Sequence, residues 1–244
     1  MNRSRLDRLL VARGLVQSRA RAADLIERGA VTVNGDVARK AGIMVSDDAT
    51  LAVEAAANAY VARSGAKLAA GLEHFGFSAD GRVALDIGAS TGGFTQVLLE
   101  RGARRVYAVE IGHGQIHPLV AADPRVVSLE GVDARTLSTE LVAEAIEAVV
   151  ADVSFIALAQ ALPAPLALAC PGAWLLALVK PQFEAGRAAI GKRGVVKDET
   201  ARAAAVEEVA AWLGRQGWRV VGSIVSPLPG KEGNIEHIIG AVLE

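Results

Sequence analysis

Four charged residues border apolar segments in a pattern that points to chemistry. Asp152 follows an apolar run in "AVVADVSF", and Lys180 follows another in "LLALVKPQF". Glu236 precedes the run "HIIGAVL", and Lys67 lies in the segment "ARSGAKLAAGL". Ammonium and carboxylate groups that meet at the ends of buried strands are typical of catalytic sites, where their surroundings tune their proton affinity. Lys67 taken alone is explained equally well as a surface charge.

The stretch "LDIGASTGGFT", residues 85–95, has the composition of a ligand-binding loop. Gly88, Gly92 and Gly93 follow an apolar strand and allow the backbone to approach a ligand closely. Their spacing differs from the G-x-G-x-x-G of dinucleotide folds, which disfavours NAD. The sheet also takes up the rest of the chain and leaves no separate substrate domain, which disfavours NAD again.

Acidic residues extend this predicted site along the chain. Asp86 can face the amino group of a methionine moiety, Glu110 ends the next predicted strand where an acid contacts ribose hydroxyls, and Asp133 ends the third, where it can accept from an adenine amino group. These features together favour S-adenosylmethionine as the cofactor. The residues expected to contact it are Asp86, Gly88, Ala89, Ser90, Thr91, Gly92, Phe94, Glu110, Asp133 and Asp152.

The elements that position these residues follow an α/β pattern. Helical stretches separate most of the apolar runs, which indicates a parallel sheet covered on both faces. The last two runs are joined by "SPLPGKEGN", which is too short for a helical crossover, so they should pair antiparallel. We therefore predict a Rossmann-like, seven-stranded methyltransferase sheet whose last strand is antiparallel. The candidate strands are 83–88, 105–110, 125–130, 148–153, 173–179, 218–225 and 236–243.

The first fifty residues indicate a separate small α+β unit. Leucines at helical spacing predict a first helix that ends near Gly14, and Ser18 can cap a second helix that stops at Gly29. The segment "AVTVNGDVA" predicts two strands joined at Asn34–Gly35, and one further strand covers residues 49–54. The alanine-rich "AAANA" that follows is the predicted linker.

Basic residues concentrate in this unit. The first forty residues contain nine Lys/Arg against four Asp/Glu, a balance of +5, whereas the remainder of the chain carries −6. Such an asymmetry favours contact with a polyanion over a merely solvated face. We place Arg3, Arg5 and Arg8 on the first predicted helix, with Arg19 and Arg21 opening the second. The residues expected to bind nucleic acid are Arg3, Arg5, Arg8, Arg19, Arg21, Lys40 and Arg63.

The segment "RLDRLLVARGLVQSRARAADLIERGAVTVNG" resembles the αL RNA-binding domain found in ribosomal protein S-four, pseudouridine synthases and tyrosyl-tRNA synthetases. The resemblance covers about the first 55 residues. It implies binding to structured RNA through shape and charge.

Five further motifs, "ARSGAKL", "LDIGASTGGFT", "ADVSFIAL", "VKPQFE" and "GNIEH", resemble the TlyA (haemolysin A-like) family of RNA methyltransferases, whose catalytic domain is of the FtsJ type. The resemblance implies an RNA-binding domain over 1–58 and a methyltransferase domain over 59–244. It also implies a catalytic tetrad of Lys67, Asp152, Lys180 and Glu236. The implied reaction transfers methyl from S-adenosylmethionine to the ribose 2′-hydroxyl of a cytidine in ribosomal RNA.

These residue types suit that reaction, because a ribose hydroxyl must lose its proton as it attacks the methyl group. Lys180 is the expected base or hydroxyl-orienting group, with Asp152 and Glu236 positioning the two lysines. Most of the rate enhancement is expected from alignment of hydroxyl, methyl and sulfur. The nucleotide is expected to be turned out of its helix to reach the site.

Some positions depart from the family pattern. Glu110 and His113 stand where an Asp and a Tyr are expected, Asp133 stands for an Asn, and Ser64 stands for a Gly. Glu110 keeps the ribose contact, whereas Asp133 adds a negative charge beside the adenine. His113 and His117 have the spacing of a zinc pair, but no third ligand is evident in the sequence, and we predict no metal site.

Two other functions compete with this interpretation. A membrane-damaging haemolysin is disfavoured because the uncharged segment 157–179 is broken by Pro163, Pro165 and Pro171 and because no amphipathic cationic helix is evident. An RNA-binding ribosome-assembly factor with a vestigial site is opposed by the complete tetrad. The single cysteine, Cys170, fits a reducing compartment, and we expect a cytoplasmic protein that meets a ribosomal subunit. Because the chain stops directly after the last predicted strand, a large-subunit target is favoured over a small-subunit one.

Overall fold

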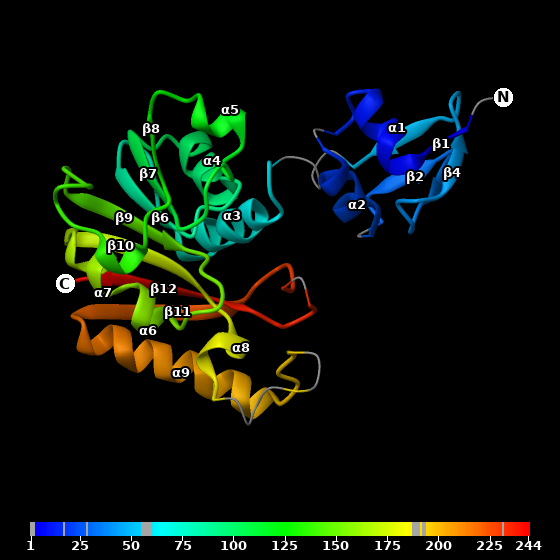
Figure 1. Ribbon diagram of the computed structural model, residues 1–244. Helices are drawn as coiled ribbons and strands as arrows, with labels where there is room; N and C mark the ends of the chain where they lie inside the picture. Colours follow the sequence, from blue (N-terminus) through cyan, green and yellow to red (C-terminus); the bar gives the residue numbers. More distant parts are fainter. Residues whose placement is uncertain are drawn as a thin grey trace. The chain divides into compact units, whose positions relative to one another are not determined.

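The computed structural model describes residues 3–16, 18–27, 29–54, 60–186, 191, 194–230 and 232–244, and it divides the chain into two compact units (Figure 1). The first unit comprises Met1–Ala62 and the second comprises Arg63–Glu244. The predicted boundary after residue 58 and the predicted linker both fall on residues 55–59, which lie outside the described residues.

The second unit is built on a seven-stranded sheet with the order β11-β12-β10-β9-β6-β7-β8. β12 pairs antiparallel with both β10 and β11, while β10, β9, β6, β7 and β8 pair parallel in that order. This confirms the predicted sheet with its antiparallel last strand. The strands are β6 (Val83–Ile87), β7 (Arg105–Glu110), β8 (Val126–Glu130), β9 (Ile146–Ala151), β10 (Ala169–Val179), β11 (Trp218–Val225) and β12 (His237–Leu243).

Burial along the strands explains why the sheet is ordered in this way. Every residue of β6 is buried, as expected for a central parallel strand covered on both faces. β11 instead alternates between intermediate and exposed side chains after Trp218, which is the pattern of an edge strand with one face toward water.

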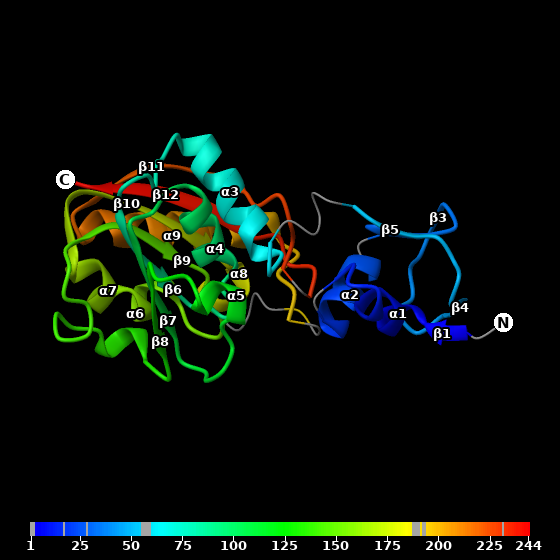
Figure 2. The same ribbon diagram turned by 90° about the horizontal axis from the view of Figure 1, so that it is seen from above.

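Helices cover both faces of this sheet (Figures 1 and 2). α3 (Ser64–Phe75), α4 (Gly93–Glu100) and α5 (Pro118–Ala121) contact β12, β6 and β8 respectively from one side. α6 (Leu158–Ala161), α7 (Pro163–Ala167) and α9 (Glu199–Arg215) lie on the other side, and α8 (Pro181–Glu184) packs on α9. The uncharged segment 157–179 forms two short helices, α6 and α7, followed by β10, and Pro171 lies within β10 without interrupting the strand. In the described part of the chain, no helix has both the length and the apolar character needed to cross a membrane.

The sheet creates a natural ligand site at one edge. β6 pairs with β7 on one side and with β9 on the other, so the chain leaves the carboxyl ends of β6 and β9 in opposite directions. In doubly wound sheets, ligands bind in the crevice at such a switch point. The glycine loop follows β6, and Asp152 follows β9.

The first unit packs two helices, α1 (Leu6–Ala12) and α2 (Arg19–Glu27), against short strands. β2 (Val31–Val33) and β3 (Asp36–Val37) form the predicted hairpin, since Asn34 and Gly35 both have positive φ, of 52° and 91°. β5 (Leu51–Val53) joins β2 on its other side. The core contains Leu6, Leu10, Leu25, Ile26 and Val31, all fully buried.

One prediction about this unit is wrong. Arg3 and Arg5 lie on a strand, β1 (Arg3–Arg5), and not on the first helix, which begins at Leu6. β1 pairs antiparallel with β4 (Met44–Ser46), a strand that was not predicted. The partner is about forty residues away in sequence, so a non-local pairing overrides the local pattern. Arg8 lies on α1 as expected.

Candidate active site

The glycine loop between β6 and α4 closes over a cavity of about 490 Å³. Gly88 has φ +80°, and a Cβ placed on it would lie 2.8 Å from the Asp152 carbonyl oxygen, so a glycine is required there. Gly92 has φ +91° and forms the N-cap of α4. Of the predicted cofactor residues, those that line the cavity are Gly88, Ser90, Glu110, Asp133 and Asp152.

Glu110 is buried at the end of β7 and holds the loop in place. Its Oε2 accepts a hydrogen bond from the Ser90 amide at 2.9 Å, and its Oε1 accepts from the Gly112 amide at 2.8 Å. Ser90 itself has φ +49°, a conformation that this hydrogen bond helps to stabilise. A carboxylate oxygen can accept a second donor, so Glu110 can also receive a ligand hydroxyl.

Asp86 occupies a different position from the one its predicted role suggests. Its side chain is fully buried, and Oδ2 accepts a hydrogen bond of 2.6 Å from the Thr95 hydroxyl on α4. Within the described part of the chain, Oδ1 has no hydrogen-bond partner. Burial raises the pKa of the Asp86 carboxyl to about 7, and the nearby carboxylates of Asp152 and Glu110 add to this. The residue braces β6 against α4 beneath the loop.

Asp133 lines the same cavity with its charge already paired. It forms a bidentate contact with Arg135, with Nε–Oδ1 at 3.0 Å and Nη2–Oδ2 at 2.6 Å. Hydrogen bonds from the Arg135 side chain and backbone lower the pKa of the Asp133 carboxyl to about 2. The additional negative charge expected at this position is therefore matched by a guanidinium two residues away.

A second cavity, of about 560 Å³, contains all four residues of the predicted tetrad. Lys67 reaches it from α3, Asp152 and Lys180 from the ends of β9 and β10, and Glu236 from the residue before β12. The alternative explanation of Lys67 as a surface charge is excluded, because its side chain is only 5% exposed.

The four side chains form two ion pairs. Lys180 Nζ lies 2.6 Å from Asp152 Oδ1 and donates a further hydrogen bond of 2.9 Å to Ser154 Oγ. Lys67 Nζ lies 2.5 Å from Glu236 Oε2, and both of these side chains are almost fully buried. Each ammonium is thus held by a carboxylate, which offsets the cost of removing the charges from water.

The two cavities share residues, which makes them parts of one site. Asp152, Ser154 and Phe155 line both of them. A ligand in the first cavity and a second molecule in the other would therefore meet at Asp152, beside Lys180. This arrangement suits transfer of a group between two bound molecules.

Phe155 is a candidate that the sequence reasoning missed. Its side chain is 91% exposed and its backbone has φ +67°, a rare conformation for an aromatic residue. Its ring lies against Phe183, with centroids 5.2 Å apart. An exposed aromatic ring beside a catalytic cavity can stack on a base. The sequence signal was its place three residues after Asp152, in "DVSF".

The predicted RNA-binding residues fall into distinct environments. Arg8, Arg19 and Lys40 are exposed on the first unit, whereas Arg21 is paired with Asp24 at 3.1 Å and its side chain is only 10% exposed. Arg3 donates to the Met44 carbonyl oxygen at 2.6 Å. Arg63 precedes α3 and lines the second cavity with the tetrad.

Of the two histidines His113 and His117, the second has a structural role. His117 is the N-cap of α5, and its Nδ1 accepts a hydrogen bond from the Leu119 amide at 3.2 Å. Across the described ranges, no three His, Cys, Asp or Glu side chains are grouped to hold a metal ion.

Comparison with known proteins identifies the chain. The FtsJ-like methyltransferase family matches residues 60–242, the whole span that carries both cavities. The chain is an FtsJ-like methyltransferase. An S4 domain matches residues 4–51 of this methyltransferase, in agreement with the resemblance of its first unit to αL domains.

Relatives of the methyltransferase span almost its entire length. It is 46% identical over 97% of its chain to the 16S/23S rRNA (cytidine-2′-O)-methyltransferase TlyA of Mycobacterium tuberculosis, of which it covers 89%. It is 33% identical over 93% of its chain to the 23S rRNA (cytidine-2′-O)-methyltransferase TlyA of Campylobacter jejuni, of which it covers 95%. Within the FtsJ-like methyltransferases, the chain belongs to the TlyA family.

A solved structure has the same two-unit architecture. A protein from Streptococcus thermophilus, provisionally described as a hemolysin, aligns with the whole methyltransferase chain and 90% of its own, with a TM-score of 0.79 and 36% identity. The fold and the domain content predicted from the sequence are therefore confirmed.

Proposed function

We propose that this methyltransferase transfers a methyl group from S-adenosylmethionine to the ribose 2′-hydroxyl of a cytidine in ribosomal RNA. The observation that carries the proposal is the junction of the two cavities. There Lys180 and Asp152 form a 2.6 Å ion pair at the end of the glycine loop's cavity, with the buried Lys67–Glu236 pair beside them. We propose in addition that the enzyme acts in the cytoplasm, since its proposed substrate is ribosomal RNA.

The volume of about 490 Å³ and the polar lining of the first cavity support S-adenosylmethionine as its ligand. In this proposal Glu110 would accept from ribose hydroxyls and Asp133 from the adenine amino group, while Gly88 lets the loop pack against the Asp152 backbone. When bound, S-adenosylmethionine supplies a methyl group that is already activated by its positively charged sulfur.

The second cavity receives the target nucleotide, with its hydroxyl at Lys180. The Lys180 ammonium is fixed by Asp152 and Ser154, so it can orient the attacking oxygen by hydrogen bonding. As the oxygen–carbon bond forms and the carbon–sulfur bond breaks, the attacking hydroxyl must lose its proton. The Asp152 carboxylate is the final acceptor: the Lys180 ammonium would pass a proton to Asp152 as its nitrogen takes the proton of the hydroxyl. Lys67 and Glu236 hold α3 and the start of β12 together and place a second ammonium near the hydroxyl.

The large ribosomal subunit is the proposed substrate. The names of both curated relatives include 23S rRNA, and only one of them also includes 16S rRNA. The net positive charge of the first forty residues supports binding to such an RNA.

The test is tritiated methyl transfer to separated large and small subunits that lack the modification, followed by mapping of the labelled nucleotide. We expect label on a cytidine ribose of the large subunit. Lys180→Ala should lower kcat by about 10²–10⁴-fold, the usual contribution of a proton-transferring side chain. Its affinity for S-adenosylmethionine, measured by calorimetry, should stay within a few-fold of the wild type.

Lys197→Ala is the matched control, because Lys197 is exposed and lies outside both cavities. It should leave methyl transfer unchanged. A Lys180→Ala protein that methylates RNA at the wild-type rate contradicts the mechanism. A protein that binds the subunit but transfers no methyl group favours the assembly-factor alternative.

A further inference from the structure

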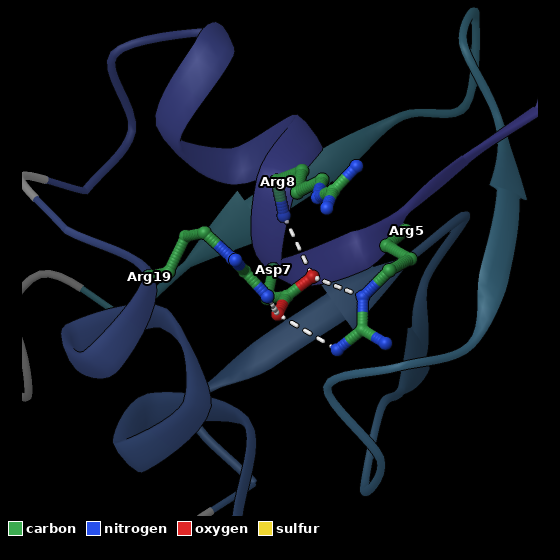
Figure 3. A network of polar contacts seen from close by, with 4 residues as sticks. All are labelled: Arg5, Asp7, Arg8 and Arg19. Atoms are coloured by element: carbon green, nitrogen blue, oxygen red, sulfur yellow. Dashed lines mark hydrogen bonds and ion pairs between the residues drawn. The ribbon is translucent and has the colours of Figure 1, made fainter.

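Asp7 is a buried carboxylate that lies between the side chains of Arg5 and Arg19 in the first unit (Figure 3). It lies in the first turn of α1, and its side chain is only 5% exposed. Arg5 contacts it in bidentate fashion, with Nε–Oδ1 at 3.1 Å and Nη2–Oδ2 at 3.0 Å. Arg19, from the start of α2, donates to the same Oδ2 at 3.0 Å through Nη2. One acid therefore joins two arginines from different elements.

Both guanidinium groups keep an open side. The Arg5 and Arg19 side chains are 42% and 53% exposed, although the carboxylate between them is buried. Each guanidinium has five N–H donors, and the bidentate contact uses only two of those on Arg5. The free donors are thus held at fixed positions and face water.

We propose that Asp7 is a positioning residue, which holds Arg5 and Arg19 as a preorganised pair that receives a backbone phosphate group of structured RNA. This inference rests on the proposed function, because the RNA is the substrate assigned above. Long arginine side chains lose conformational freedom when they bind a ligand, and Asp7 imposes that order before RNA arrives. The planar guanidinium suits a phosphate because it can donate two parallel hydrogen bonds.

Positioning by Asp7 and net charge alone predict opposite changes in RNA affinity when the negative charge of Asp7 is removed. Removing a carboxylate from an RNA-binding surface should strengthen RNA binding if only net charge matters. If Asp7 acts by positioning, Asp7→Asn should weaken the affinity for unmodified large subunits by about tenfold. The slope of log affinity against log salt should also become shallower by about one, because an arginine that is no longer held contributes less to phosphate binding.

Two control variants isolate the role of the charge. Asp36→Asn removes one negative charge from the exposed strand β3 of the same unit and should leave binding unchanged or make it tighter. Arg5→Ala/Arg19→Ala should bind weakly, and adding Asp7→Asn to it should cause no further loss. Methyl-transfer kinetics should show the same loss of binding: Asp7→Asn should raise the KM for subunits and leave kcat unchanged.

A second set of variants does not alter Asp7, in case Asp7→Asn does not fold. Arg5→Lys and Arg19→Lys keep the charge but lose the planar fork, and each should weaken binding several-fold. Arg39→Lys is the control, because Arg39 is exposed on the same unit and is not among the residues expected to bind RNA. Arg8 is unsuitable as a control because it is among those residues, although it donates to the Asp7 carboxylate only through its backbone amide (Figure 3).

The outcomes separate this inference from the proposed function. If wild-type protein binds and methylates the subunit but Asp7→Asn binds as tightly or more tightly, the positioning role is wrong and the proposed function stands. If Asp7→Asn weakens the double arginine variant as much as it weakens the wild type, Asp7 acts through the fold alone and the inference is also overturned. If wild-type protein methylates neither subunit, the proposed function itself fails.

Discussion

Phe155 combines an exposed ring with a backbone conformation that costs free energy, and such strain persists only where the surrounding structure imposes it. Strained residues of this kind cluster at functional sites. Phe155 lines both cavities, and we propose that its ring stacks on a base that has been turned out of its helix.

Replacing Phe155 should therefore separate stability from activity. Phe155→Gly relieves the positive φ and should raise the free energy of unfolding by about 1 kcal/mol. It should also lower kcat/KM for the ribosomal subunit by about tenfold or more, since stacking on an aromatic ring contributes about 1–3 kcal/mol per base. Thermal unfolding and methyl-transfer kinetics measure the two effects. Phe155→Tyr keeps the ring and should retain activity, whereas equal activity in Phe155→Gly contradicts the stacking role.

Asp86 should make the stability of the second unit depend on pH. Its pKa, raised to about 7 by burial, exceeds the ordinary value of 3.8, so the folded state holds a proton that the unfolded chain releases. The free energy of unfolding should consequently decrease as the pH rises from about 4 to about 7. The asparagine in Asp86→Asn cannot ionise. The Tm of this variant relative to that of the wild type should therefore increase as the pH rises from about 4 to about 7. A Tm difference that is the same at pH 4 and pH 7 argues against the assignment.

The sequence predicts the residues of the candidate site better than it predicts their partners. Asp152, Lys180 and Glu236 were singled out because strand ends converge at one edge of the sheet, and the family resemblance adds Lys67 to them. The Lys67–Glu236 pair depends on the packing of α3 against β12, and the Lys180–Asp152 pair depends on side-chain positions at the neighbouring ends of β10 and β9. No local pattern encodes either pair. The same limit applies to Asp7, whose two arginine partners include one twelve residues away on another helix.

At the scale of the elements, the loop between β6 and α4 is expected to be highly sensitive to the addition of a single side-chain atom. Gly88→Ala combines a positive φ with a Cβ 2.8 Å from the Asp152 carbonyl oxygen, and backbone atoms cannot move aside cheaply. We expect a loss of about 3 kcal/mol or more in the free energy of unfolding and a large loss of affinity for S-adenosylmethionine.

Gly81→Ala provides the matched comparison. Gly81 has φ +69°, but nothing lies within 4 Å of a Cβ built on it. This variant should lose only about 1 kcal/mol, the cost of the backbone conformation, and should bind S-adenosylmethionine normally. Equal losses in the two variants would show that the contact with Asp152 does not matter.

Element boundaries show where sequence reasoning succeeds. The seven sheet strands were located within a few residues because buried parallel strands are continuous apolar runs bounded by polar residues. β1 and β4 were not predicted, because each is only three residues long and gains its stability from the other across the unit. Short pairings between distant segments leave no periodic signal.

At the scale of the whole molecule, charge is divided between a basic beginning and an acidic remainder. Affinity for the subunit should therefore depend strongly on salt. If Arg3, Arg5, Arg8, Arg19 and Lys40 each neutralise a phosphate, the slope of log affinity against log salt is about −4, and doubling the salt weakens binding roughly 15-fold. Filter binding at several salt concentrations measures this slope.

Binding of S-adenosylmethionine should respond less to the same change in salt, because two of the carboxylates that line its proposed site, Asp133 and Asp152, are already paired with cationic side chains. A subunit affinity that is insensitive to salt contradicts recognition through the phosphate backbone and points to contacts with ribosomal protein.

The position of β12 has a consequence for how the enzyme is made. This strand is inserted between β10 and β11, although it follows every other strand of the sheet in sequence, and the Lys67–Glu236 contact spans 169 residues. During translation, β6 to β9 can fold and form the cofactor cavity early, while the tetrad stays incomplete until β12 has left the exit tunnel. With the mechanism proposed here, a nascent chain whose cofactor cavity has formed still lacks the Lys67–Glu236 ion pair, and competence for methyl transfer is acquired last.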